Sequence, residues 1–277
     1  MRGASANGFQ IGFRIFFALF FVIFLLAPTA LHAQTPLRVA AAADLSPVLP
    51  PILDEFQRAT GIHAEATYQA SAMLTTEIQN GAPFDLFLSA DLGYPKKLIE
   101  LGLADAGGLA DASGSAESKT PITYAKGTLV LWERKDSPLP PPSLDLLRSP
   151  DLKRLAIANP DRAPYGRAAV AALTSLKLYD SLKPRIVTAE NIAQAAQFAD
   201  SANADAGLIS LTSALTPHMQ AGGTYFVIPR DLYPPIEQGV VIVSSTKQRE
   251  AAHKLLDFLL SIPVQAELAK SGLTPVK

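Results

Sequence analysis

The chain has 277 residues, no cysteine, 24 basic and 25 acidic residues, and a formal net charge of −1 at pH 7. The lack of cysteine excludes disulfides and thiolate chemistry, and the slightly acidic balance argues against a nucleic-acid-binding protein, which presents a basic face. The histidines (His32, His63, His218 and His253) show no metal-ligand spacing, so we expect no zinc site and no direct cation ligands.

The first 33 residues are predicted to be a secretory signal peptide. Arg2 and Arg14 give a basic start, an apolar run covers 15–27, and 30–33 offers small residues for cleavage. The apolar run has 13 residues, whereas a membrane span needs about 20, so an uncleaved anchor is the weaker alternative. Without the two arginines, 22 basic residues face 25 acidic ones, a charge of −3. We therefore expect a periplasmic protein in which bulk charge does not attract anions.

The next part of the chain alternates strand and helix patterns. Gly61, Gly81 and Gly102 each follow a helix pattern in the position that favours a left-handed C-terminal residue. Three strand–helix units in a row favour a mostly parallel sheet covered by helices. The predicted strands are 37–42, 62–68 and 85–89, and the predicted helices are 46–60, 71–80 and 94–101.

The remainder predicts a second α/β block. The segment 106–120 is rich in Gly, Ala and Ser and is expected to be a surface loop, and the prolines of 137–143 exclude regular structure there. The segment 122–133 is predicted to be one long strand. Further strands are expected at 155–158, 184–188, 206–210, 225–228 and 239–244, and helices at 165–176, 191–199, 248–260 and 263–270.

Four of the predicted helix starts share a property that favours anion binding. The first four N–H groups of a helix have no partner inside it, and the helix dipole adds about half a positive charge there. Several such ends in one cleft would bind an oxyanion without lysine or arginine. Behind an export signal, this pattern suggests a capture protein rather than an enzyme. The starts are at 43–44, 71–72, 164–166 and 191–192.

Several motifs, together and in order, resemble the periplasmic molybdate-binding proteins of ABC importers. The segments GAPFDLFLSAD and NPDRAPYG are the most specific of them. The matching segments span nearly all of the chain after the signal: VAAAADL (39–45), ASAML (70–74), NGAPFDLFLSAD (80–91), YAKGTLVLW (124–132), IANPDRAPYGRAA (157–169), ENIAQAAQ (190–197) and DLYPPIEQGVVIV (231–243).

The resemblance implies a two-lobed α/β periplasmic binding protein of the type II kind. Each lobe would be a mostly parallel sheet flanked by helices, with the ligand in the cleft between the lobes and a hinge that closes on it. The implied division is 34–122 plus 239–277 for lobe one and 123–238 for lobe two. The resemblance further implies capture of molybdate and also tungstate, delivery to an ABC permease in the inner membrane, a monomer, no cofactor and no enzymatic activity.

The family's ligand donors, transferred position by position, coincide with the predicted helix starts. The resemblance implies N–H or hydroxyl donors rather than a metal–protein bond. A position that is tyrosine in some members is Ser210 here, which could supply a hydroxyl or no contact. The implied positions are Asp44 preceded by Ala43, then Ser71, Tyr165 and Ile192.

Asp44 departs from the family pattern, because many members have Ser or Thr at this position. A carboxylate beside a dianion is repulsive, by about 4 kcal/mol for unit charges about 4 Å apart at an effective dielectric of about 20. We therefore predict that Asp44 binds through its backbone N–H. Its side chain should turn away and cap the helix that begins near Ser46.

Other interpretations of these residues remain open from the sequence. If Asp44 acts as an acceptor, the ligand would be a protonated oxyanion such as phosphate or a phosphonate. Ser71 could be an ordinary helix N-cap, and Asp85 and Asp91 are read as turn or capping residues. A periplasmic hydrolase is the remote alternative, because no base accompanies Ser71 in the sequence.

Overall fold

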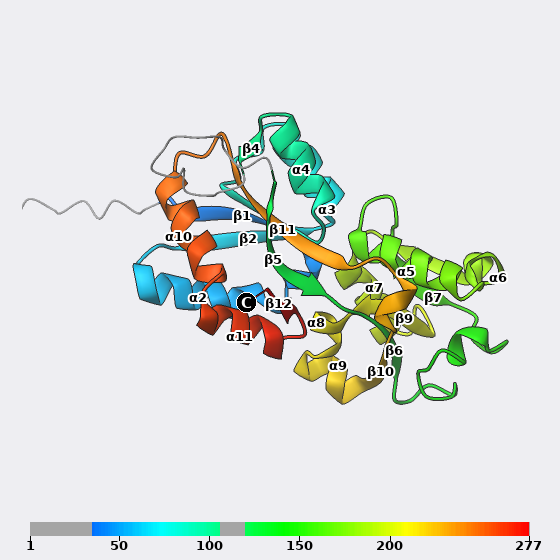
Figure 1. Ribbon diagram of the computed structural model, residues 1–277. Coiled ribbons are helices and arrows are strands. Elements are labelled where there is room, and N and C mark those ends of the chain that lie inside the picture. Colours follow the sequence, from blue (N-terminus) through cyan, green and yellow to red (C-terminus); the bar gives the residue numbers. More distant parts are fainter. Residues whose placement is uncertain (1–34, 106–119, 277) are drawn as a thin grey trace, which may run out of the picture. The chain divides into compact units, whose positions relative to one another are not determined.

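The computed structural model describes residues 35–105 and 120–276 (Figure 1). The predicted signal peptide, residues 1–33, lies outside the described residues, as does nearly all of the predicted loop 106–120. Within the described ranges, no helix is both long and apolar enough to cross a membrane.

The first sheet combines the early strands with strands from the end of the chain (Figure 1). Its order is β12-β5-β11-β3-β1-β2, with β4 beside β11. β1 pairs in parallel with β2 and β3, whereas β11 runs antiparallel to β3, β4 and β5. The strands are β1 (Leu37–Ala42), β2 (Ala64–Gln69), β3 (Leu86–Ser89), β4 (Ala104–Asp105), β5 (Ile122–Gly127), β11 (Ile236–Val243) and β12 (Thr274–Pro275).

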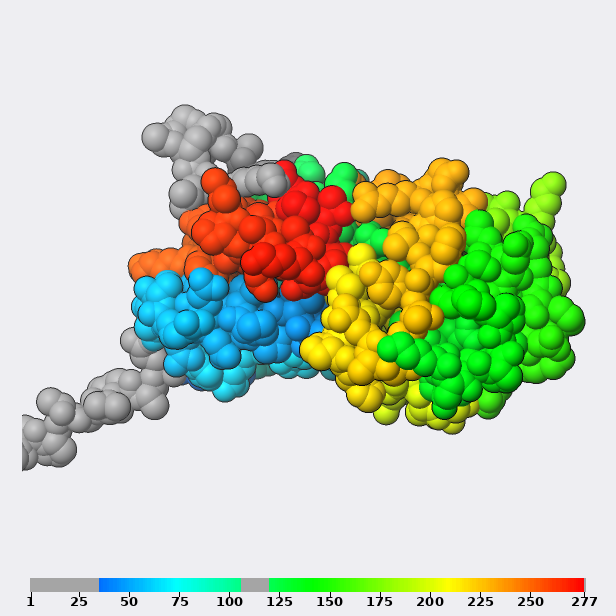
Figure 2. Space-filling view, turned by 90° about the horizontal axis from the view of Figure 1, so that it is seen from below, coloured from blue at the N-terminus to red at the C-terminus, as the bar shows by residue number. Residues whose placement is uncertain are grey.

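Helices from both ends of the chain share a core on this sheet. Apolar side chains of α2, α10 and α11 pack in one cluster with β1, β3 and β11, and Figure 2 shows the C-terminal helices in red directly beside the N-terminal elements in blue. Gly61 ends α2 with φ 75°, a left-handed conformation that costs glycine little. The helical elements are the 3₁₀ turn η1 (Ala43–Leu45), α2 (Leu49–Thr60), α3 (Ser71–Gln79), α4 (Gly93–Glu100), α10 (Arg249–Leu259) and α11 (Ile262–Lys270).

The second sheet is built from one continuous stretch of chain. Its order is β10-β6-β9-β7-β8, with β7 parallel to β8 and β9, and β6 antiparallel to β9 and β10. The strands are β6 (Leu129–Arg134), β7 (Leu155–Ala158), β8 (Ile186–Ala189), β9 (Ala206–Ser210) and β10 (Gly223–Val227). The helices are α5 (Pro164–Ser175), α6 (Tyr179–Leu182), α7 (Ile192–Asp200), α8 (Leu211–Ala214) and α9 (Pro217–Gly222), with 3₁₀ turns η2 (Leu146–Arg148), η3 (Lys183–Arg185) and η4 (Arg230–Leu232).

The predicted architecture of two α/β blocks is confirmed, with differences in detail. Both sheets are mixed rather than mostly parallel, because β11 returns into the middle of the first sheet and β6 and β10 run against β9. The predicted strand 122–133 is two strands in different sheets, separated at Thr128. The chain therefore changes sheets at Thr128 and again between Val227 and Ile236.

The apolar cluster of the second sheet extends to the first sheet. It includes Trp132 and Leu208 from the second sheet, and also Ala42, Ala70 and Ala90, which follow or end strands of the first. Small side chains at these positions let backbone from the two sheets approach closely. The carboxyl ends of the parallel strands β1, β2 and β3 thus face the part of the second sheet where α5 and α7 begin.

Candidate functional site

One pocket collects all four predicted helix starts. Its lining comes from the carboxyl ends of β1 and β2, from the residue after β3, and from the starts of α3, α5 and α7. Among the described residues that line it there is no lysine, arginine or histidine. The lining residues are Ala42, Ala43, Asp44, Gln69, Ala70, Ser71, Ala90, Ala163, Pro164, Tyr165, Asn191 and Ile192.

The helix starts present unpaired backbone donors to this pocket. The N–H groups of Ser71, Tyr165 and Ile192 form no hydrogen bond with another described residue, as expected for the first turn of a helix. Asn191 caps α7 by accepting from the N–H of Gln194 at 3.0 Å, which leaves the N–H of Ile192 free. Free N–H groups and helix dipoles from both sheets make the pocket suited to a small anion.

Ser71 is the first residue of α3 and is not its cap. The N-cap is Ala70, with φ −63° and ψ 139°, and it makes no side-chain hydrogen bond. The Ser71 hydroxyl oxygen accepts the N–H of Ala90 at 3.1 Å. Because this oxygen acts as the acceptor in that bond, the hydroxyl hydrogen is available to donate into the pocket.

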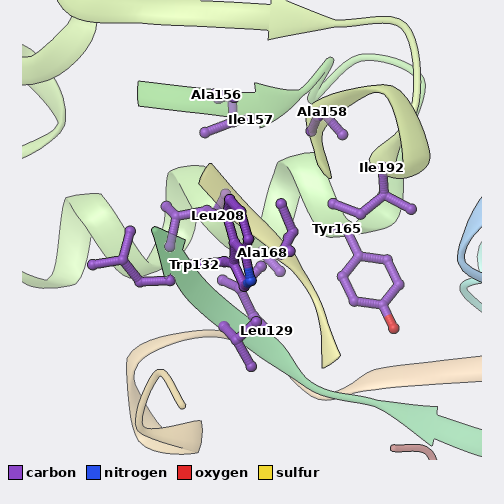
Figure 3. Close-up of a cluster of buried hydrophobic side chains, with 14 of the residues drawn as sticks. Leu129, Trp132, Ala156, Ile157, Ala158, Tyr165, Ala168, Ile192 and Leu208 are labelled. Atoms are coloured by element: carbon purple, nitrogen blue, oxygen red, sulfur yellow. The ribbon is translucent and has the colours of Figure 1, made fainter. Parts of the chain in front are cut away.

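Tyr165 joins the two sheets. Figure 3 shows Tyr165 beside Ile192 at one end of the apolar cluster, with its hydroxyl pointing away from Trp132. That hydroxyl donates to Asp44 Oδ2 at 3.1 Å. The ring is 1% exposed, so the side chain serves packing and the Asp44 contact, while the backbone N–H remains at the pocket.

The Asp44 side chain is buried between the sheets and does not cap a helix. It is 1% exposed, and its Oδ2 accepts from the Gln238 side-chain amide at 2.5 Å as well as from Tyr165. The prediction that it caps the following helix is wrong, because α2 begins only at Leu49 and neither η1 nor α2 has a side-chain cap. Thr212 of α8 donates its hydroxyl to the Asp44 backbone carbonyl at 2.8 Å, which adds a second link between the sheets.

Burial is the largest cause of the pKa shifts of Asp44 and Tyr165. It raises the pKa of the Asp44 carboxyl from 3.8 to about 6, and the hydrogen bonds from Gln238 and Tyr165 act in the opposite direction. Burial, followed by the charge of Asp44, raises the pKa of Tyr165 well above 10. At neutral pH, Tyr165 is therefore a firm hydrogen-bond donor, whereas Asp44 is close to its titration range.

Ser210 does not line the pocket. It is fully buried, its oxygen caps α8 by accepting from the N–H of Ser213, and it exchanges hydroxyl hydrogen bonds with Thr212 and Ser213 at 2.9 Å. Ala43, the other additional candidate, does line the pocket. Asp91 does not line the pocket, and its Oδ1 accepts from the N–H of Tyr94 at 3.0 Å, which is a turn-capping contact.

Sequence reasoning missed several residues that shape the site. Gln238 is a fully buried amide within an apolar strand, and that break in the apolar pattern was the available signal. Two glycines permit close approaches: a Cβ on Gly127 would lie 2.2 Å from the Tyr165 hydroxyl, and one on Gly166 would lie 2.3 Å from the Ala158 carbonyl oxygen.

A second set of contacts ties α4 to α5 outside the pocket. Arg167 forms an ion pair with Asp91, donates to the Tyr94 hydroxyl at 3.3 Å, and places its guanidinium 5.4 Å from the centre of the Tyr94 ring. The Tyr94 hydroxyl also approaches the Asp161 carbonyl at 3.5 Å. We call Asp91, Tyr94 and Arg167 the latch.

A scan against protein-family models matches residues 37–274 to the family described as bacterial extracellular solute-binding protein. The match covers both sheets and every element of the pocket. The chain belongs to this family. A solute-binding protein presents its ligand pocket between two α/β halves, which is where the four helix starts meet in this chain.

Relatives within this solute-binding family are similar over most of the chain. The molybdate-binding protein ModA of Azotobacter vinelandii is 36% identical over 247 residues, covering 89% of this chain and 92% of the relative. The ModA protein of Rhodobacter capsulatus is 36% identical over 204 residues, covering 74% of each. Among solved structures, the Azotobacter vinelandii periplasmic molybdate-binding protein superposes with a TM-score of 0.77 at 30% identity, covering 87% of this chain and all of that one.

Proposed function

We propose that this protein captures molybdate, and also tungstate, in the periplasm and delivers it to an ABC permease of the inner membrane. The observation that carries the proposal is the convergence of unpaired neutral donors from both sheets on one pocket without cationic side chains. These donors favour a fully ionised oxyanion, because a protonated one brings an O–H that needs an acceptor, a role for which the Asp44 carboxyl would have to remain ionised. The two relatives named above, both molybdate-binding proteins, support the same ligand.

The donors that we assign to the anion come from four positions. They are the backbone N–H groups of Asp44, Tyr165 and Ile192, and the N–H and hydroxyl of Ser71. The protein acts as a monomer, holds no cofactor and binds no cation directly. Among the described residues, no group of three or more His, Asp or Glu side chains could hold a metal ion. The Ser71 hydroxyl is paired with a backbone N–H and not with a base, so we assign no catalytic role.

Calorimetric titration of the protein with molybdate, tungstate, sulfate and phosphate tests this function. We expect molybdate and tungstate to bind about 100-fold more tightly than sulfate or phosphate, a difference of about 2.7 kcal/mol. Ser71→Ala removes a hydrogen bond to a charged ligand and should weaken molybdate binding by roughly 10- to 100-fold. Ser261→Ala, which removes a hydroxyl bonded to Phe258 away from the pocket, is the matched control. Phosphate binding without a molybdate response would contradict the proposal.

The latch should affect how long the anion stays bound. Arg167→Ala removes contacts that hold α4 and α5 together, so we expect molybdate to dissociate about 2- to 5-fold faster, the range for a partly exposed ion pair. Arg154→Ala is a close control, because Arg154 and Asp205 form an ion pair of similar exposure within the second sheet. Stopped-flow displacement of molybdate by tungstate measures the rate. Equal rates for both variants would show that the latch has no part in retention.

A further inference from the structure

The Asp44 carboxyl is a negative charge at an anion pocket without a compensating cation. Asp44 is one of the residues that line the pocket, and it is 1% exposed. Among the described residues it takes part in no ion pair, and its Oδ1 is buried without a hydrogen-bond partner. The Oε1 atom of its neighbour Gln238 is likewise buried without a partner. Asp44 and Gln238 are in contact, and each therefore has one buried acceptor oxygen to which no donor is bonded.

The groups that surround this carboxyl are neutral. Tyr165 of α5 and Gln238 of β11 donate to it, and Tyr124 of β5 is a buried phenol close enough to feel its charge. Thr212 of α8 bonds to the Asp44 backbone. Tyr233 is a further buried phenol, and its hydroxyl oxygen accepts the N–H of Leu129. Burial raises the pKa of Tyr124 and Tyr165 well above 10, so neither phenol competes with Asp44 for protons near neutral pH.

An incoming dianion makes the ionised carboxylate costly. The carboxylate charge, about 8 Å from a dianion at an effective dielectric of about 20, weakens binding by roughly 1000-fold, and at about 4 Å it does so by roughly a millionfold. Protonating the Asp44 carboxyl, whose pKa is about 6, costs only about tenfold one pH unit above that value. Binding the anion with a protonated Asp44 therefore requires less free energy than binding it beside an ionised Asp44.

We propose that Asp44 binds one proton together with the anion, so that the protein captures a molybdate dianion and a proton as a pair. The proton comes from the solvent and adds to a carboxylate oxygen, and no covalent bond breaks. The new O–H makes the Asp44 carboxyl a donor as well as the acceptor of the Tyr165 and Gln238 bonds at Oδ2. The Gln238 Oε1 atom, which has no partner, is an available acceptor on the neighbouring side chain. This inference rests on the proposed function, because it requires a dianion in the pocket.

Proton uptake can be counted directly by calorimetry. Molybdate is titrated into the protein at several pH values, each in two buffers of different ionisation enthalpy. We expect close to one proton taken up per molybdate at about pH 8 and almost none at about pH 5, where Asp44 is already protonated. The affinity should fall by up to about tenfold per pH unit above about pH 6. Molybdate itself stays a dianion above that pH.

Two variants assign the proton to Asp44. In Asp44→Asn the amide keeps the shape of the side chain but cannot ionise, so we expect no proton uptake and an affinity independent of pH above about pH 6. Asp91→Asn is the control, because this carboxylate belongs to the latch and does not line the pocket. Its proton count should equal that of the unmodified protein even if its affinity is lower.

The outcomes separate the inference from the function on which it rests. Tight molybdate binding without proton uptake at about pH 8 would overturn the inference and leave the function standing. Uptake that persists in Asp44→Asn would overturn it in the same way. Absence of molybdate binding at every pH would instead reject the proposed function, and the inference with it.

Discussion

Gly166→Ala should reduce molybdate affinity by about 100-fold or more, the loss expected from disturbing one or two charged hydrogen bonds. Gly166 is the third residue of α5 and packs directly on the end of β7. A Cβ at this position would lie 2.3 Å from the Ala158 carbonyl oxygen and 2.8 Å from the Asn159 carbonyl carbon. Both atoms are backbone, so the helix start has to move. The displaced start carries the N–H of Tyr165 and the ring that reaches Asp44.

The measurement is a molybdate titration together with thermal unfolding of the same sample. Overpacking of this kind costs about 1–3 kcal/mol of stability, which leaves a folded protein in which affinity can be measured. Gly222→Ala is a suitable control, because this helical glycine lies away from the pocket and its Cβ would come no closer than 3.7 Å to the nearest atom. Unchanged affinity and stability in Gly166→Ala would refute the steric argument.

Asp44→Asn should stabilise the anion-free protein at neutral and alkaline pH. In the folded state burial raises the pKa of Asp44 from 3.8 to about 6. Folding therefore favours the protonated carboxyl, so its contribution to stability is fully present below pH 3.8 and is lost as the pH rises through about 6. Over that interval the loss amounts to about 3 kcal/mol. Asparagine does not ionise, so the variant does not undergo this loss of stability.

Urea unfolding of the dialysed protein at about pH 4, 6 and 8 measures this effect. The free energy of unfolding of Asp44→Asn should exceed that of the unmodified protein by about 1–3 kcal/mol at about pH 8. The difference should shrink toward about pH 4, and comparing the two proteins at each pH cancels the titration of all other groups. A difference that does not vary with pH, or a variant that is less stable at about pH 8, would contradict the assigned ionisation.

Local signals were sufficient to predict most helices and strands and the four helix starts of the pocket. Gly61 and Asn191 end or begin their helices through contacts within a few residues, so the sequence near them carries the information. The meeting of these starts in one pocket depended on the order of the strands. That order came from the family resemblance, since no single segment encodes it.

Long-range contacts explain what the sequence could not show. The partners of the Asp44 carboxyl, Tyr165 and Gln238, lie 121 and 194 residues further along the chain, so local capping rules gave the wrong side-chain role. The segment 122–133 has the composition of a single β run without a proline, yet its halves pair with β11 and β9 in different sheets. Short elements such as α8 and α9 contain too few residues for a helical period to be visible.

The position of β11 has a consequence for biosynthesis. The described strands of the second sheet all lie between Leu129 and Val227, so they all emerge before β11, whether from the ribosome or from the export channel. In the first sheet, β3 ends at Ser89 but its neighbour β11 ends at Val243. At translation rates of about 5–20 residues per second, β3 waits roughly 10–30 s for its partner. The half of the protein that is synthesised first is thus finished last, and the half inserted within it is the first able to fold.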